Sequence, residues 1–155
     1  MKKIMLLCLI ISIAGINSCK KDSDSASSNN CSLPNGFLRC TAGSADFCAD
    51  QTLFADYAIV MTINGIAGNG STLTLELDDV TTGTYQMKEL TNHLLYTSPL
   101  GDSFETTDDN PGTLVITSNN TATNTIEGTY TSTVRSPLSG NLNLTKGMFK
   151  VFYTE

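Results

Sequence analysis

Apolar and polar residues alternate along most of the chain from residue 37 onward, in short segments separated by glycine, asparagine and proline. In residues 72–78, Leu73, Leu75 and Leu77 alternate with threonine and acidic residues. A period of two places these leucines on one face of a β-strand and the polar residues on the other. Further strands are predicted at residues 55–64, 83–87, 94–98, 113–117, 125–132, 142–145 and 148–154.

Turn signals between these segments indicate the fold class. Residues 37–49 contain Ala-Gly-Ser-Ala, which predicts a hairpin between two short strands, and Asn64-Gly65 is typical of a strand end. Lys146-Gly147 predicts a bulge or turn in the last segment. Residues 87–95 alone have a helical period, enough for a single turn. We therefore expect an all-β domain, an antiparallel β-sandwich or partly open barrel of about 8–10 short strands.

The first residues have a different pattern. Lys2 and Lys3 precede an apolar run from Ile4 to Ile16. At about 1.5 Å per residue this run spans roughly 20 Å, short of the ~30 Å hydrocarbon layer, so a cleaved signal is favoured over a transmembrane helix. The predicted organisation is a lipoprotein signal peptide at residues 1–18, a flexible membrane tether at 19–35, and a single β domain at 36–155.

Cys19 is the predicted lipid attachment site. The sequence Ile16-Asn-Ser-Cys19 resembles the bacterial lipobox, in which a branched apolar residue and a small residue precede the modified cysteine. Several acyl chains, at ~0.8 kcal/mol per buried methylene, would make attachment effectively permanent. The alternative is an ordinary secretory signal cut elsewhere, which would leave Cys19 as a plain thiol.

Charge and cysteine content limit the binding partners, the disulfides and the metal sites that can be expected. The chain has 15 acidic and 9 basic side chains, and this balance argues against nucleic acid and against adhesion to anionic headgroups. We expect a turn at Gly43 and Ser44 to bring Cys40 to Cys48 as a disulfide. Cys31 with either of them is the competing pairing. Three cysteines without a nearby histidine do not make a usual zinc site, and we expect no metal or cofactor.

Other candidate side chains carry weaker signals. His93 could join Asp102 or Asp56 in a Ser–His–Asp arrangement, but no nucleophile motif accompanies it, so we interpret it as an ordinary loop or strand-end residue. The possible calcium ligands are Asp78, Asp79, Asp102, Asp108, Asp109 and Asn110, which lack the spacing of a calcium loop. The aromatic residues that could line a carbohydrate or peptide surface are Tyr57, Tyr85, Tyr96, Phe104 and Tyr130. We expect no catalytic residue, and the ligand-binding residues are not defined by the pattern.

Several motifs together resemble a family of small uncharacterised surface lipoproteins from Bacteroidota. They are Ser18-Cys-Lys-Lys-Asp22, the small-residue turn of the first hairpin, Gly83-Thr-Tyr85, Gly112-Thr-Leu-Val-Ile-Thr117, Thr125-Ile-Glu-Gly-Thr-Tyr130 and Thr145-Lys-Gly-Met-Phe-Lys-Val151. The resemblance implies an all-β domain and a cell-envelope location. It implies no activity, because the family has none assigned.

The resemblance also suggests where the protein acts. Lys20-Lys-Asp-Ser-Asp24 is similar to acidic export signals that send such lipoproteins to the outer face of the outer membrane. We expect a lipid-anchored, outward-facing, non-enzymatic binding or adaptor module for a glycan, peptide or protein. The alternative is a lipocalin-like carrier, which would need an apolar cavity of several hundred Å³ inside the barrel.

Overall fold

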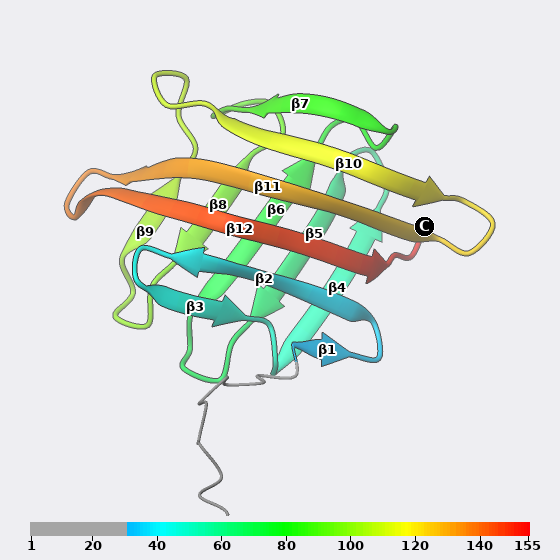
Figure 1. The fold of residues 1–155 in the computed structure, drawn as a ribbon, viewed down its shortest axis with the longest axis horizontal. Helices are drawn as coiled ribbons and strands as arrows, with labels where there is room; N and C mark the ends of the chain where they lie inside the picture. Colours follow the sequence, from blue (N-terminus) through cyan, green and yellow to red (C-terminus); the bar gives the residue numbers. More distant parts are fainter. Residues whose placement is uncertain (1–30) are drawn as a thin grey trace, which may run out of the picture.

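A computed structural model describes residues 31–155, and all of its regular elements are β-strands (Figure 1). Their bounds are β1 Ser32–Leu33, β2 Gly36–Ala42, β3 Ala45–Cys48, β4 Thr52–Tyr57, β5 Met61–Ile66, β6 Thr72–Leu77, β7 Gly83–Met87, β8 Leu94–Thr97, β9 Ser103–Glu105, β10 Gly112–Asn120, β11 Thr125–Ser136 and β12 Gly140–Phe152. The expected all-β class is confirmed, although the strands within residues 31–155 number twelve and the last two are long.

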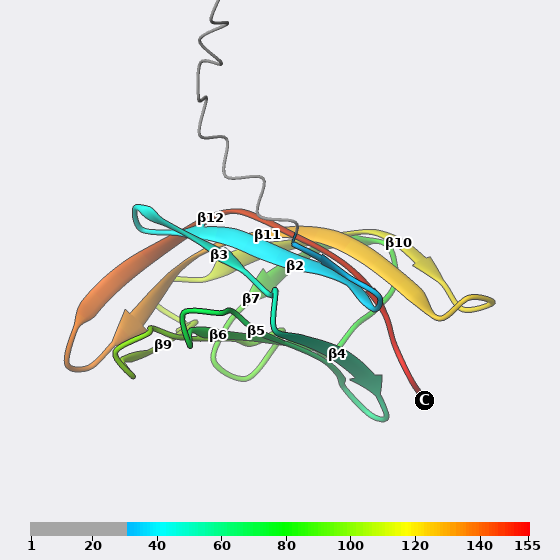
Figure 2. The same cartoon turned by 90° about the horizontal axis from the view of Figure 1, so that it is seen from below.

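The strands form two layers, which Figure 2 shows edge-on. The front sheet has the order β3-β2-β12-β11-β10-β7, with β1 also paired to β2, and the back sheet has the order β4-β5-β6-β8-β9. All ladders between these strands are antiparallel. Because neighbouring strands in a sheet rotate relative to one another, the strands of the two layers cross at an angle in Figure 1.

Backbone hydrogen bonds join the two sheets on both sides, so that the antiparallel sheet is nearly closed into a barrel. On one side, Arg135 of β11 pairs with Glu105 of β9. On the other, the Thr154 amide donates to the Ala55 carbonyl at 3.1 Å, and its carbonyl accepts from the Tyr57 amide at 2.8 Å. The segment after β12 therefore covers part of the edge of β4, which would otherwise be unpaired.

The core lies between the sheets and comes from the period-two faces predicted from the sequence. Leu73, Leu75 and Leu77 of β6 have no exposed surface. On the front sheet, Leu114 and Tyr130 are also buried, and the Tyr130 hydroxyl donates to the Arg39 carbonyl at 3.1 Å. A buried hydroxyl with a partner avoids the cost of an unsatisfied polar group. Side chains from both sheets thus fill the interior.

Some of the predicted boundaries were wrong. Residues 55–64 were expected to form one strand, but β4 and β5 are separate and the turn between them exposes 90% of Ile59. Gly65, predicted to end a strand, lies inside β5. A Cβ at this position would lie 2.6 Å from the Ala49 Cβ and 3.0 Å from a Leu38 methyl group. The glycine is needed because Ala49 and Leu38 leave no space for a side chain at this position of β5.

Of three other predictions, one is confirmed and two are wrong. Lys146-Gly147 does form a bulge, since the register of β12 with β2 shifts between Thr145 and Met148 and Lys146 has a φ of 54°. Residues 88–93 contain no helical turn. The folded part also begins earlier than residue 36, because β1 lies within the stretch assigned to the tether.

Candidate functional site

The outward face of the back sheet carries a cluster of polar side chains. The register aligns Phe54, Asn64 and Thr74 across β4, β5 and β6, and Glu76 follows Thr74 on the same face. We call this surface the acidic face. It consists of Phe54, Asp56, Asn64, Thr74, Glu76, His93 and Glu105. Their side chains all point away from the core because they alternate with its buried residues.

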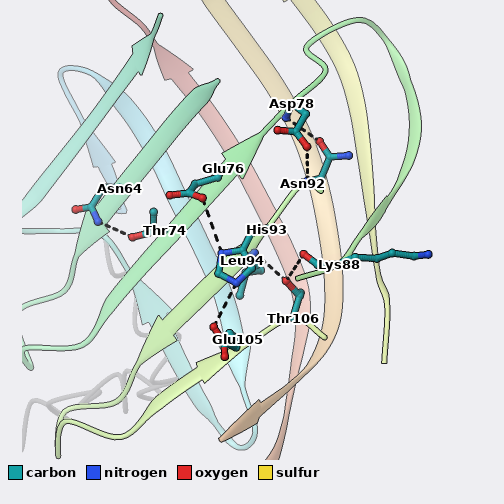
Figure 3. Close-up of polar contacts among 10 residues, drawn as sticks. All are labelled: Asn64, Thr74, Glu76, Asp78, Lys88, Asn92, His93, Leu94, Glu105 and Thr106. Atoms are coloured by element: carbon teal, nitrogen blue, oxygen red, sulfur yellow. Dashed lines mark hydrogen bonds and ion pairs between the residues drawn. The ribbon is translucent and has the colours of Figure 1, made fainter. Parts of the chain in front are cut away.

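His93 lies between two carboxylates on this face (Figure 3). Its Nδ1 is 4.0 Å from Glu76 Oε2, and its Nε2 is 3.5 Å from Glu105 Oε2. About half of each glutamate side chain is exposed, whereas only 19% of the histidine side chain is. The imidazole is therefore held at the centre while the carboxylate oxygens remain open to a ligand.

Hydrogen bonds on both sides fix the backbone that carries His93. Asn92 is buried with a φ of 49°. Its Oδ1 accepts from the backbone amide of Asp78 at 3.1 Å, and its backbone amide donates to Asp78 Oδ2 at 3.2 Å. On the other side, Thr106 Oγ1 accepts from the Leu94 amide and donates to the Lys88 carbonyl, both at 3.1 Å. Figure 3 shows both sets of contacts next to His93. They preorganise the site.

The residues considered for hydrolytic chemistry are not brought together. The contacts of His93 are with glutamates, whereas Asp102 accepts from the Ser139 hydroxyl at 2.8 Å and Asp56 from the Thr154 hydroxyl at 3.0 Å. A Ser–His–Asp unit requires the base to reach both a nucleophile and an orienting carboxylate. The arrangement around His93 offers hydrogen-bond acceptors and negative charge instead.

Two of the aspartates considered as calcium ligands, Asp78 and Asp79, have local structural roles. Asp78 binds Asn92, and Asp79 Oδ1 accepts from the Thr81 amide and hydroxyl, both at 2.8 Å. These hydrogen bonds hold the pKa of Asp79 below its usual value. Within residues 31–155, no group of three or more His, Cys, Asp or Glu side chains has the geometry to hold a metal ion.

The aromatic side chains proposed to line a binding surface belong to the core. Tyr96, Phe104 and Tyr130 are each at most 7% exposed, and Tyr57 and Tyr85 pack against the same core. The aromatic residues that are open to solvent had not been singled out. They are Phe54 on the acidic face and Phe152 on the front sheet, each 48% exposed. Each of them alternates with buried residues along its own strand, and this alternation could have identified them as outward-facing.

The predicted disulfide pairing was wrong, because Cys31 bonds to Cys48. The hairpin register pairs Cys40 with Phe47 and Arg39 with Cys48. Cys40 and Cys48 therefore point to opposite faces of the sheet. Cys40 is a buried free thiol, and burial raises its pKa to about 11, so it behaves as a small apolar core residue.

An open groove of about 470 Å³ lies on the outward face of the front sheet, next to the disulfide. Arg39, Lys146 and Met148 line it, together with Asp46, whose Oδ1 accepts from the Thr41 hydroxyl at 3.0 Å. We call this the basic groove. A second open groove, of about 220 Å³, lies farther along the same face between β10, β11 and β12. Neither groove is an enclosed cavity inside the barrel.

These observations define an all-β domain with a filled core and a preorganised polar surface on each sheet. The chain belongs to the family described as Domain of unknown function (DUF6252), which matches residues 48–151. No curated protein and no solved structure matches the chain. Within residues 31–155 there is no helix with the length and apolar character to cross a membrane. Cys19, the predicted lipidation site, and the predicted signal peptide lie outside the described residues.

Proposed function

We propose that this chain is a lipid-anchored protein of the outer membrane, facing the cell exterior, and that it acts as a non-catalytic binding or adaptor module. Its ligand would be a glycan, a peptide or a protein. The observation that carries the binding role is the Glu76–His93–Glu105 cluster, with exposed carboxylates around a clamped imidazole. Phe54, on the same face but two strands away from Glu76, adds an exposed apolar surface on which a sugar ring or an apolar side chain can pack.

The position of this surface in the domain supports the same role. Cys31, the first described residue, lines the basic groove on the front sheet, whereas the acidic face belongs to the back sheet. With Cys19 as the anchor, the chain would enter the described domain at Cys31, on the side of the front sheet. The domain would then present the acidic face away from the membrane, where a large partner can reach it.

The packed interior gives no support to the lipocalin-like alternative. Such a carrier encloses its ligand in a cavity within the barrel, whereas residues 31–155 fill that space with buried side chains from both sheets. The two grooves lie on the outside. The packed interior is consistent with a ligand that binds on the outer surface.

The anchor can be tested separately from binding. In cells, the wild-type chain is expected to remain with the membrane fraction after carbonate washing, because acyl chains on Cys19 hold it there. The Cys19→Ala variant should be released. A variant that stays membrane-bound would show that the lipidation assignment is wrong.

The binding role can be tested by probing glycan and peptide arrays with the mature chain and with Glu76→Gln/Glu105→Gln. This variant keeps the size of both side chains and removes their charge. We expect ligands of the wild type to be lost, while the matched variant Glu127→Gln, on the front sheet, retains them. An unchanged binding profile in the double variant, or no array signal for the wild type, would contradict the assignment of the acidic face.

A further inference from the structure

The basic side chains of the domain are distributed unevenly. Arg39, Lys146 and Lys150 are three of the five basic residues after residue 30, and all three lie on the outward face of β2 and β12. Lys150 forms an ion pair with Glu127. Arg39 and Lys146 have no ion pair among residues 31–155, although the chain as a whole is strongly acidic. Two unpaired cations thus line one concave surface.

The local backbone holds both cations in place. Arg39 stacks over the Phe37 ring, 5.5 Å from its centroid, and its Nη2 contacts the Met148 sulfur at 3.5 Å. Lys146 occupies the bulge in β12 in a left-handed conformation, which is unusual for a residue with a side chain. The next residue, Gly147, packs so tightly against Tyr130 that a Cβ would overlap it. The bulge is therefore built into the sheet and displays Lys146 at the groove.

Exposed apolar side chains accompany the cations. Met148 is 37% exposed and Phe152 is 48% exposed, and both point outward from β12 beside Lys150. A surface that combines basic groups with an aromatic and a thioether side chain suits the polar–apolar boundary of a bilayer. The acidic face on the other sheet would be repelled by the same phosphate groups.

We propose that the face formed by the basic groove, Lys150 and Phe152 docks on the lipid head groups of the membrane that holds the anchor, with Arg39 and Lys146 contacting their phosphates. This inference rests on the lipid anchor in the proposed function. Cys31 lines the groove, so the tether would leave the domain on the docking side. The anchor supplies a high local concentration of lipid, which compensates for the domain's overall negative charge. Docking then leaves the acidic face outward.

A matched pair of fluorescent variants can test this orientation. The chain has no tryptophan, and Phe152 and Phe54 are equally exposed on opposite sheets. Phe152→Trp and Phe54→Trp chains that begin at Cys19, produced without lipid, would be coupled through the Cys19 thiol to maleimide lipid in phosphatidylethanolamine–phosphatidylglycerol vesicles. Cys40 is buried and the other two cysteines are bonded, so they should not react. This coupling does not depend on natural lipidation, so failure of docking and failure of the anchor are distinguishable.

We expect coupling to protect the tryptophan of Phe152→Trp from acrylamide and to shift its emission to shorter wavelength, while the tryptophan of Phe54→Trp stays accessible. Adding Arg39→Gln and Lys146→Gln should weaken docking about fivefold for each cation removed and abolish the protection. Replacing the phospholipid by a galactolipid without phosphate should have the same effect. Equal accessibility of the two tryptophans, or protection that survives loss of both cations, would overturn the proposal.

Discussion

The two sheets of this domain are built in different ways. The ladders of the back sheet run without a register shift, and most of its inward positions hold aliphatic side chains such as Leu75, with buried aromatic residues only in β8 and β9. The front sheet has longer strands with shifts near residues 117, 131 and 146. It also holds a disulfide, a buried thiol and the buried hydroxyl of Tyr130. Regular alternation describes the back sheet apart from Gly65, whereas the front sheet depends on particular residues where its pairing is irregular.

The largest expected effect is in the back sheet. Leu75→Ala should lower the free energy of unfolding by about 2–5 kcal/mol, because it removes a side chain with no exposed surface and leaves a cavity. Thr129→Ala, at an exposed front-sheet position, is the control and should change stability by no more than about 0.5 kcal/mol. Urea denaturation followed by circular dichroism gives both values. Similar losses for the two variants would contradict the difference in burial.

The front sheet should depend on its disulfide. Replacing both Cys31 and Cys48 by alanine should lower the free energy of unfolding by about 3 kcal/mol, since the bond closes a loop with a sequence separation of 17. A reducing agent should destabilise the wild type and Cys40→Ala by a similar amount. The double variant should not respond to it. A reductant-sensitive melt in the double variant would show that Cys40 takes part in a bond.

The buried thiol should make the front sheet sensitive to alkali. Burial raises the pKa of Cys40 from 9.0 to about 11, so above pH 9 the unfolded chain loses the proton that the folded chain retains. Stability is therefore full below pH 9 and falls as the pH rises towards 11, by at most about 2–3 kcal/mol at about 1.4 kcal/mol per pH unit.

Thermal melts between pH 8 and 11 would measure this decrease. Cys40→Ala should have a shallower decrease, and what remains above pH 10 belongs in part to Tyr130, whose buried hydroxyl has a raised pKa. If the two chains lose stability in parallel across this range, then Cys40 is not the titrating group.

The sequence predicted the regular parts of the fold and missed features that depend on register. The alternation in β6 identified its buried face correctly. The turn before β5 was missed because residues 58–60 are apolar and contain none of the usual turn residues. The disulfide was mispredicted because the hairpin register was not worked out. A two-residue turn between Ala42 and Ala45 pairs Cys40 with Phe47, so Cys48, the next residue, points to the opposite face of the sheet. The predicted turn already excluded the predicted bond.

The candidate site was harder to predict because its members come from different strands. Glu76, His93 and Glu105 lie on β6, just before β8 and on β9, and none of them forms a local motif with another. Their proximity depends on how β6, β8 and β9 pair, which single-sequence alternation does not specify. Alternation does predict that each faces outward, but any outward carboxylate would satisfy that pattern.

The pairing of β2 with β12 has a consequence for how the chain acquires its structure. Phe37 is the register partner of Lys150, so β2, near the start of the domain, can complete its pairing only after β12, the last strand of the domain, has been synthesised. Contacts between such distant segments slow folding. A chain secreted while it is still being synthesised would therefore begin to cross the membrane before its barrel could close. It would still be unfolded during the crossing.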